Sequence, residues 1–88
     1  MRVTESTILE EALKAKLWER DTLEKQHRET DGVSYWIAYG YIMKGIKKDI
    51  LELGEKYATM HGLDLDGDMF CGTYLNLLEL RSEVRRND

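Results

Sequence analysis

The sequence predicts an all-α protein: an antiparallel three-helix bundle or helical hairpin built around one long central helix. Three observations support this fold class. The chain contains no proline, the strongest helix breaker. Apolar residues recur every three or four positions through most of its length. A heptad pattern also continues unbroken through its middle. The 88 residues suffice for one domain, 1–88.

The first helix is expected at about 6–29. Thr7 and Glu10 have the spacing of a capping box, in which the two side chains bind free amides of the first turn. The pattern ends near Gly32, which suits a helix end. Leucines recur on one face at four-residue spacing: Leu9, Leu13 and Leu17.

The second helix, about 34–61, gives the strongest signal. A helix of this length spans about 42 Å. Three glycines lie within it, and each costs about 1 kcal/mol relative to alanine, which suggests a kink or the close approach of another backbone. The apolar seam has two sets of residues at seven-residue spacing, offset by three: Trp36, Met43, Ile50 and Tyr57, with Tyr39, Ile46, Leu53 and Met60.

Residues 33–43 also admit a strand, because large and small side chains alternate there and aromatic residues are frequent. A helix is favoured because the heptad register continues into the helix beyond Lys44. A lone strand would also lack a partner, since no other segment resembles one.

A third helix is expected at about 68–86. Asp66 or Asp68 would cap its first turn, and three arginines near its end suit the negative end of the helix dipole. Its apolar positions cover more than one face. Because the connections are short, the three helices should be antiparallel neighbours.

Composition limits the classes of function. The net charge of −4 argues against broad nucleic-acid binding, which needs clustered cations. The sequence shows neither a signal peptide nor an apolar stretch long enough for a membrane span, so we expect a cytoplasmic protein without membrane association. The single cysteine, Cys71, has apolar neighbours and is expected to be a buried thiol rather than a reactive one.

No catalytic or metal site emerges from the motifs. The acidic run 64–68 fits no EF-hand frame, because neither alignment supplies all of the required ligands. Glu24 and His27 have the spacing used in di-iron bundles, but no carboxylate is expected opposite them. The serines lie in no glycine-rich elbow. We therefore expect no catalytic residue, no metal and no cofactor, and do not expect an enzyme.

The first half of the second helix is predicted to contact another chain. It carries bulky side chains on every face, and a helix that is apolar all round is buried all round. Two neighbouring helices can cover only part of it. The alternative is a monomer with exposed aromatic residues. The predicted interface residues are Tyr35, Trp36, Ile37, Tyr39, Tyr41, Ile42 and Met43.

A basic zone is the second candidate. In an antiparallel bundle, cations of the second and third helices reach one level, with Lys16 and Arg20 near it. Such a zone could hold a phosphate, a nucleotide or an acidic partner. The favoured alternative is that these cations point outward and pair with neighbouring acids such as Glu19, Asp49, Glu52 and Glu83. The zone comprises Lys44, Lys47, Lys48, Arg81, Arg85 and Arg86.

The predicted function is therefore that of a non-enzymatic helical interaction protein. It would act as a regulator, inhibitor or adaptor by binding a protein partner as a homo-oligomer, with a dimer favoured. The alternative function is a helical oligomer that binds an anionic small ligand, such as a nucleotide or phosphate, or nucleic acid through the basic zone.

Overall fold

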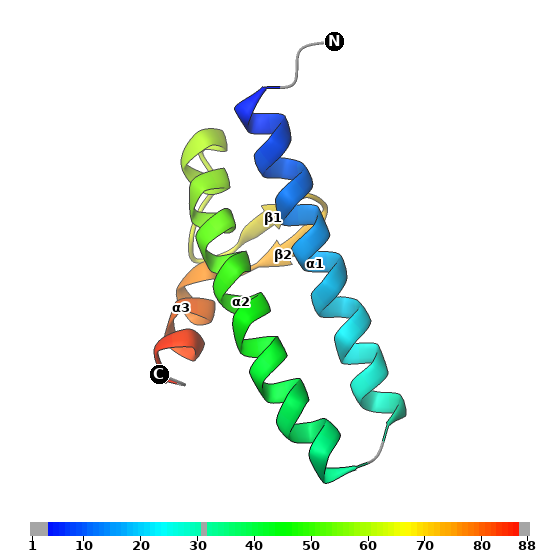
Figure 1. Cartoon of the computed structure of the whole chain (residues 1–88). Coiled ribbons are helices and arrows are strands. Elements are labelled where there is room, and N and C mark those ends of the chain that lie inside the picture. The colour runs from blue at the N-terminus through cyan, green and yellow to red at the C-terminus, as the bar shows by residue number, and fades with distance from the viewer. Residues whose placement is uncertain (1–3, 31, 87–88) are drawn as a thin grey trace.

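The computed structural model describes residues 4–30 and 32–86, without the side chains of 33–35. Most of the described residues are helical, so the predicted all-α class fits roughly, although a small two-stranded sheet is also present. The elements in order are α1 (Glu5–Glu29), α2 (Val33–His61), β1 (Asp68–Phe70), β2 (Thr73–Leu75) and α3 (Leu77–Arg86) (Figure 1).

The helices α1 and α2 form a long antiparallel pair. The first cap differs from the predicted one: the hydroxyl of Thr4 accepts a hydrogen bond from the Thr7 amide at 3.1 Å, so Thr7 lies inside the helix. The long central helix is confirmed, and residues 33–43 are helical, so the strand alternative is wrong. It ends at Gly62, where φ is 66° and the amide donates to the Ala58 carbonyl.

The prediction of a single helix over 68–86 is wrong in its first half. Residues 68–75 form a β-hairpin in which Asp68 pairs with Leu75 and Phe70 with Thr73. Both residues of its turn, Cys71 and Gly72, have positive φ (51° and 82°), as a two-residue type I′ turn requires.

The physical reason is burial with a period of two. Phe70 and Leu75 are buried, whereas their neighbours Met69 and Tyr74 are exposed, so one face of the hairpin packs on the core. The helix α3 begins only afterwards, and Asn76 caps it by accepting a hydrogen bond from the Glu79 amide at 3.0 Å, in place of the predicted aspartates.

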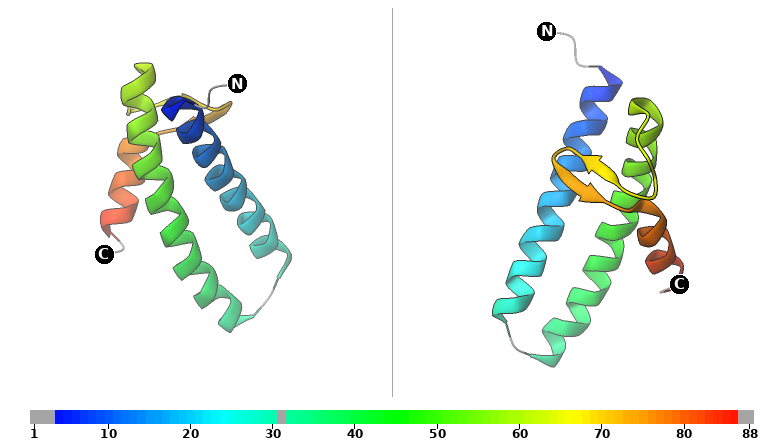
Figure 2. Two further views of the ribbon diagram at one scale, coloured as in Figure 1. Left: turned by 45° about the horizontal axis from the view of Figure 1, so that its top comes forward. Right: turned by 180° about the vertical axis from the view of Figure 1, so that it is seen from behind.

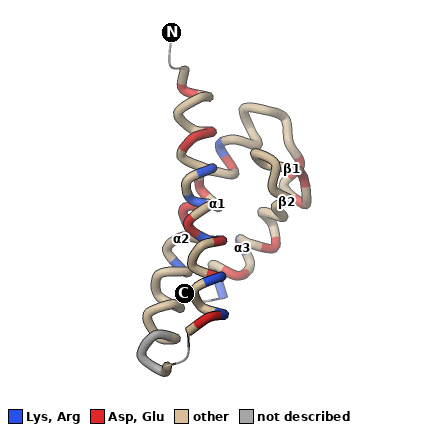
Figure 3. Tube along the Cα trace, turned by 90° about the vertical axis from the view of Figure 1, so that its right-hand side faces the viewer, with Lys and Arg blue, Asp and Glu red and all other residues tan. Residues whose placement is uncertain are grey.

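The hairpin and α3 lie on one side of the helix pair (Figures 2 and 3). The fully buried side chains of the core come from all of these layers: Leu13, Ile50, Phe70 and Leu77. Within the described residues, α3 packs against α2 and not against α1, so the fold is a helix pair with a hairpin and a short helix on one face rather than a three-helix bundle.

The end of the helix pair that carries the α1–α2 connection extends beyond the sheet and α3 (Figure 1). We call this part, residues 18–29 of α1 and 33–44 of α2, the two-helix arm. In the arm only one neighbouring helix covers each helix.

Candidate functional site

The two-helix arm carries an exposed apolar surface on α2. Trp36, Ile37 and Tyr41 have exposed fractions of 55%, 60% and 77%, and we call these three residues the aromatic patch. Together with Gly40 and Lys44 they line one shallow hollow. Because Gly40 has no side chain, the hollow reaches down to the helix backbone.

Contacts with α1 hold one edge of the patch in place. The imidazole of His27 stacks on Tyr39, with ring centroids 3.8 Å apart and an interplanar angle of 12°. The same imidazole meets Trp36 edge-on at 4.1 Å. Trp36 and Tyr39 are three residues apart, so one face of α2 presents both rings to the end of α1. The indole is thereby oriented while more than half of its surface stays exposed.

The remaining predicted interface residues lie elsewhere. Met43 is buried in the seam between the two long helices, so this predicted interface residue exposes almost no surface to another chain. Tyr39 is half-buried against His27. Ile42 is exposed on a different side of α2 from the patch. The side chain of Tyr35 lies outside the described part of the structure.

A second apolar surface, which the sequence reasoning missed, is the groove between α1 and α2. The groove contains two hollows, one near each end. Between them, the Lys16 ammonium donates to the carboxylates of Asp49 at 3.2 Å and Glu19 at 3.4 Å. These hydrogen bonds raise the pKa of the Lys16 ammonium. The upper hollow, near the start of α1, includes Ile8, Leu9, Ala12, Leu53, Lys56 and Met60. The lower hollow includes Trp18, Thr22, Leu23, Gln26, Ile42 and Ile46.

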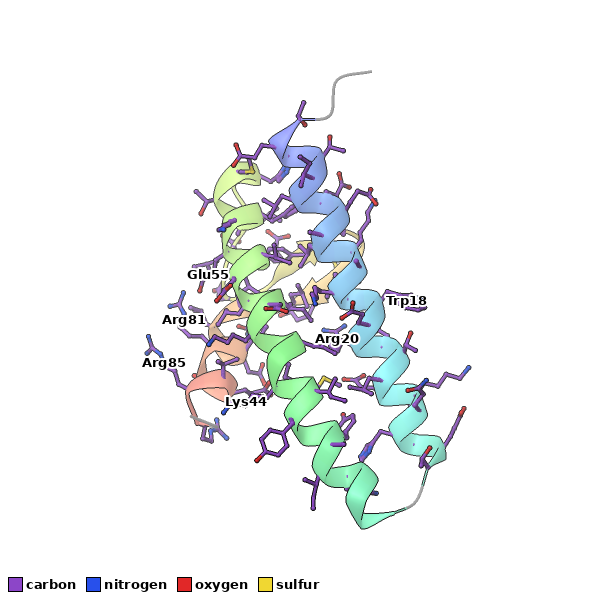
Figure 4. The ribbon with its side chains drawn as sticks, in the orientation of Figure 1. Trp18, Arg20, Lys44, Glu55, Arg81 and Arg85 are labelled. Carbon is purple, nitrogen blue, oxygen red and sulfur yellow. The ribbon has the colours of Figure 1, made fainter. Side chains whose placement is uncertain are left out.

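We call the whole of this surface the front groove. Figure 4 places Trp18 at the outer edge of α1, away from α3. The available sequence signal was a second set of heptad spacings beside the seam, which starts at Leu9 on α1 and at Ile42 on α2.

The predicted basic zone follows the α2–α3 edge, where Lys44, Arg81 and Arg85 are seen together with Glu55 (Figure 4). Two of its cations already form ion pairs with acidic side chains. Arg81 donates to Glu55 at 2.7 Å, and Lys47 lies 3.4 Å from Glu83. These pairs lower the net positive charge that an anion would meet. Lys48, Arg85 and Arg86 are exposed.

Two groups among the described residues could take part in covalent chemistry, the Cys71 thiol and a serine–histidine contact. Burial raises the pKa of the Cys71 thiol, which makes it less nucleophilic. Ser6 Oγ and His61 Nε2 lie 3.2 Å apart at the exposed end of the helix pair, a contact that the sequence did not reveal. In a catalytic triad the histidine activates the serine, an acid orients the imidazole, and an oxyanion hole stabilises the intermediate. Within the described residues no acid is hydrogen-bonded to His61.

Over the described residues, no three or more His, Cys, Asp or Glu side chains are grouped so that they could hold a metal ion. None of the helices in that part of the chain combines the length and the apolar character needed to cross a lipid bilayer. Comparison of the chain with protein-family models, with curated proteins and with solved structures finds no match.

Proposed function

We propose that this chain is a non-enzymatic helical interaction protein that assembles with itself and binds a protein partner through the aromatic patch. The observation that carries the proposal is the exposure of Trp36, Ile37 and Tyr41 together on an arm that the sheet and α3 do not cover. Tryptophan and tyrosine are enriched among the residues that dominate binding energies, and contiguous exposed apolar surface marks interaction sites.

The local geometry suits the insertion of an apolar side chain of the partner. The hollow above Gly40 has Trp36 and Tyr41 at its sides, and Lys44 lies at its rim. The contact of Trp36 with His27 holds the indole before a partner arrives, which reduces the entropy lost on binding. Such a surface fits a regulator, an inhibitor or an adaptor, whose effect comes from binding alone.

The anion-binding alternative has less support, because Arg81 and Lys47 are already paired with acids. A thermal-shift screen with phosphate and nucleotides tests it directly. An anion present at 100 times its dissociation constant would stabilise the folded state by about 2.7 kcal/mol. We expect no shift in the melting temperature.

Affinity capture from cells that carry the gene tests the proposed partner binding. Ile37→Glu and Tyr41→Glu each place a charge in the patch, whereas Lys48→Glu changes a charge on the same face of α2, seven residues beyond Tyr41. We expect the wild type and Lys48→Glu to capture one partner protein in similar amounts. The two patch variants should capture at least tenfold less of that protein. All three positions are exposed, so melting temperatures should stay close to that of the wild type. Equal capture by every variant would overturn the proposal.

A further inference from the structure

The front groove repeats at seven-residue intervals on both of its walls. This spacing keeps residues on one helix face, at steps of about 10.5 Å. The walls meet at three levels: a mixed apolar and charged upper level, an ionic middle level and an apolar lower level. The α1 wall contributes Leu9, Lys16 and Leu23, and the α2 wall contributes Lys56, Asp49 and Ile42 at the corresponding levels.

No other described element covers this face. The hairpin and α3 lie on the opposite side of the helix pair, as the view from behind and the side view show (Figures 2 and 3). Large apolar side chains are exposed at both ends of the groove: Ile8 and Met60 at the upper hollow, and Trp18 and Ile42 at the lower one. A helix pair that is apolar on its open face is suited to be half of a four-helix arrangement.

The charges of the groove point to a particular occupant. Lys16 on the α1 wall lies level with Asp49 on the α2 wall. In the upper hollow, Glu5 lies on the α1 wall and Lys56 on the α2 wall. Lys16 and Glu5 on the α1 wall therefore each have an oppositely charged residue, Asp49 or Lys56, on the α2 wall. The walls also carry Glu19 and Glu55, which are already paired with Lys16 and Arg81. A second copy whose α1 lies over this α2 would place each cation against a carboxylate of the other copy.

Only one direction of the two-fold axis achieves this match. An axis parallel to the helices puts α1 of each copy over α2 of the other, so Lys16 meets the second copy's Asp49, and Glu5 meets its Lys56. An axis perpendicular to the helices would put α1 over α1, with Lys16 facing the second copy's Lys16. The parallel axis also makes all neighbouring helices antiparallel, as in an up-and-down bundle.

We propose that the front groove is the homodimer interface, closed by a second copy about a two-fold axis parallel to α1 and α2. This inference rests on the proposed function, because self-association is part of that function. The dimer buries Trp18 and Ile42, while the aromatic patch faces away from the groove. Both patches then lie at the same end of the dimer, so a partner with two binding segments could engage them together.

A charge-exchange experiment in the full-length chain tests the dimer. Light scattering at tens of micromolar should show a dimer for the wild type and for Lys48→Glu, a control at an exposed position on the face of α2 that carries the aromatic patch. Lys16→Glu and Asp49→Lys should each be at least tenfold weaker in self-association, because each homodimer would oppose like charges. An equimolar mixture of the two should recover the dimer, since the new carboxylate of one variant meets the new ammonium of the other.

An ion pair that acts only within one chain cannot be restored by mixing. A monomeric wild type, single variants that dimerise as the wild type does, or a mixture that stays monomeric would each overturn the proposal.

Disulfide trapping tests the direction of the axis. In a Cys71→Ser background, a mixture of Ile8→Cys and Lys56→Cys should give a covalent heterodimer on mild oxidation, because the parallel axis brings these positions together. The mixture of Ile8→Cys with Gln26→Cys is the matched alternative, since a perpendicular axis would bring those two positions together. Preferential trapping of the second pair would refute the parallel axis.

The two proposals fail separately. If mixing the two charge variants fails to restore the dimer while the patch variants still lose their partner, only the dimer proposal falls. If the dimer forms as described but patch variants capture the same proteins as the wild type, only the proposed partner binding falls.

Discussion

The three glycines within α2 allow the packing of the fold to be tested by one type of substitution. Alanine in place of glycine removes a helix penalty of about 1 kcal/mol at any interior position. At Gly40 and Gly45 the added Cβ would meet no atom within 4 Å. At Gly54 it would lie 3.0 Å from Cδ2 and 3.2 Å from Cδ1 of Leu77, whose side chain is fully buried.

The same substitution should therefore have opposite effects at the two kinds of site. Gly45→Ala should stabilise the fold by about 1 kcal/mol, a rise of roughly 4–8 °C in melting temperature for a domain of this size. At Gly54 the crowding of Leu77 costs about 1–3 kcal/mol, as overpacking of a filled core does. Once the helix gain of about 1 kcal/mol is subtracted, Gly54→Ala should be neutral or destabilising by up to about 2 kcal/mol.

Circular dichroism during thermal and urea denaturation measures both effects. All samples need the same protein concentration, because self-association adds to the apparent stability. A melting temperature for Gly54→Ala raised as much as that for Gly45→Ala would refute the reasoning, since it would mean that Leu77 yields at no cost.

Three further predictions concern the hairpin and α3. Phe70→Ala should cost about 3–5 kcal/mol in urea unfolding, because the ring is fully buried; a loss below about 1 kcal/mol would show that the hairpin does not close the core. Asn76→Ala should cost about 1 kcal/mol through the lost cap of α3, and an unchanged urea midpoint would contradict that role. The amides of Asp64 and Met69 lower the pKa of Asp68, so its contribution to stability is present above the unfolded-state pKa and is lost as the pH falls through the folded-state pKa. The stability difference between wild type and Asp68→Asn should therefore shrink below about pH 4, and a constant difference in pH-dependent melting would refute this.

The sequence predicted α2 well because its seam is a long local repeat. The predicted range 34–61 differs from Val33–His61 by one residue, and seam residues such as Met43 and Ile50 are buried. A repeat over four heptads gives many independent indications of one period, so single glycines do not obscure it.

The hairpin was missed because each strand has only three residues, too few to establish a period of two. Its turn also begins with Cys71, a residue type that does not normally signal a positive φ. A warning was nonetheless present. The apolar positions of 68–86 covered more than one face, whereas a single amphipathic helix carries its apolar residues on one face. Two successive elements with different periods explain this pattern.

The aromatic patch was predicted only as part of a larger set, for a physical reason. A helix with apolar side chains on every face predicts that several faces are buried. Which of these faces the same chain buries depends on the position of the neighbouring elements in the fold. The seam turns Met43 inward, and α1 presents His27 to Tyr39, so both side chains contribute to folding. The front groove was missed because its middle level is a salt bridge, which by periodicity alone resembles a solvated surface.

In the proposed assembly, folding and association draw on separate residues of α2. α2 spans about 44 Å whereas α3 spans about 15 Å, so nothing in the described chain covers the outer face of the arm. The side chains exposed there, such as Ile37 and Tyr41, add little to the stability of the isolated chain. Each would contribute about 1.5–3 kcal/mol only when another chain buries it. Substitution of Ile37 or Tyr41 should accordingly weaken binding without lowering the melting temperature, whereas substitution of Phe70 should lower the melting temperature.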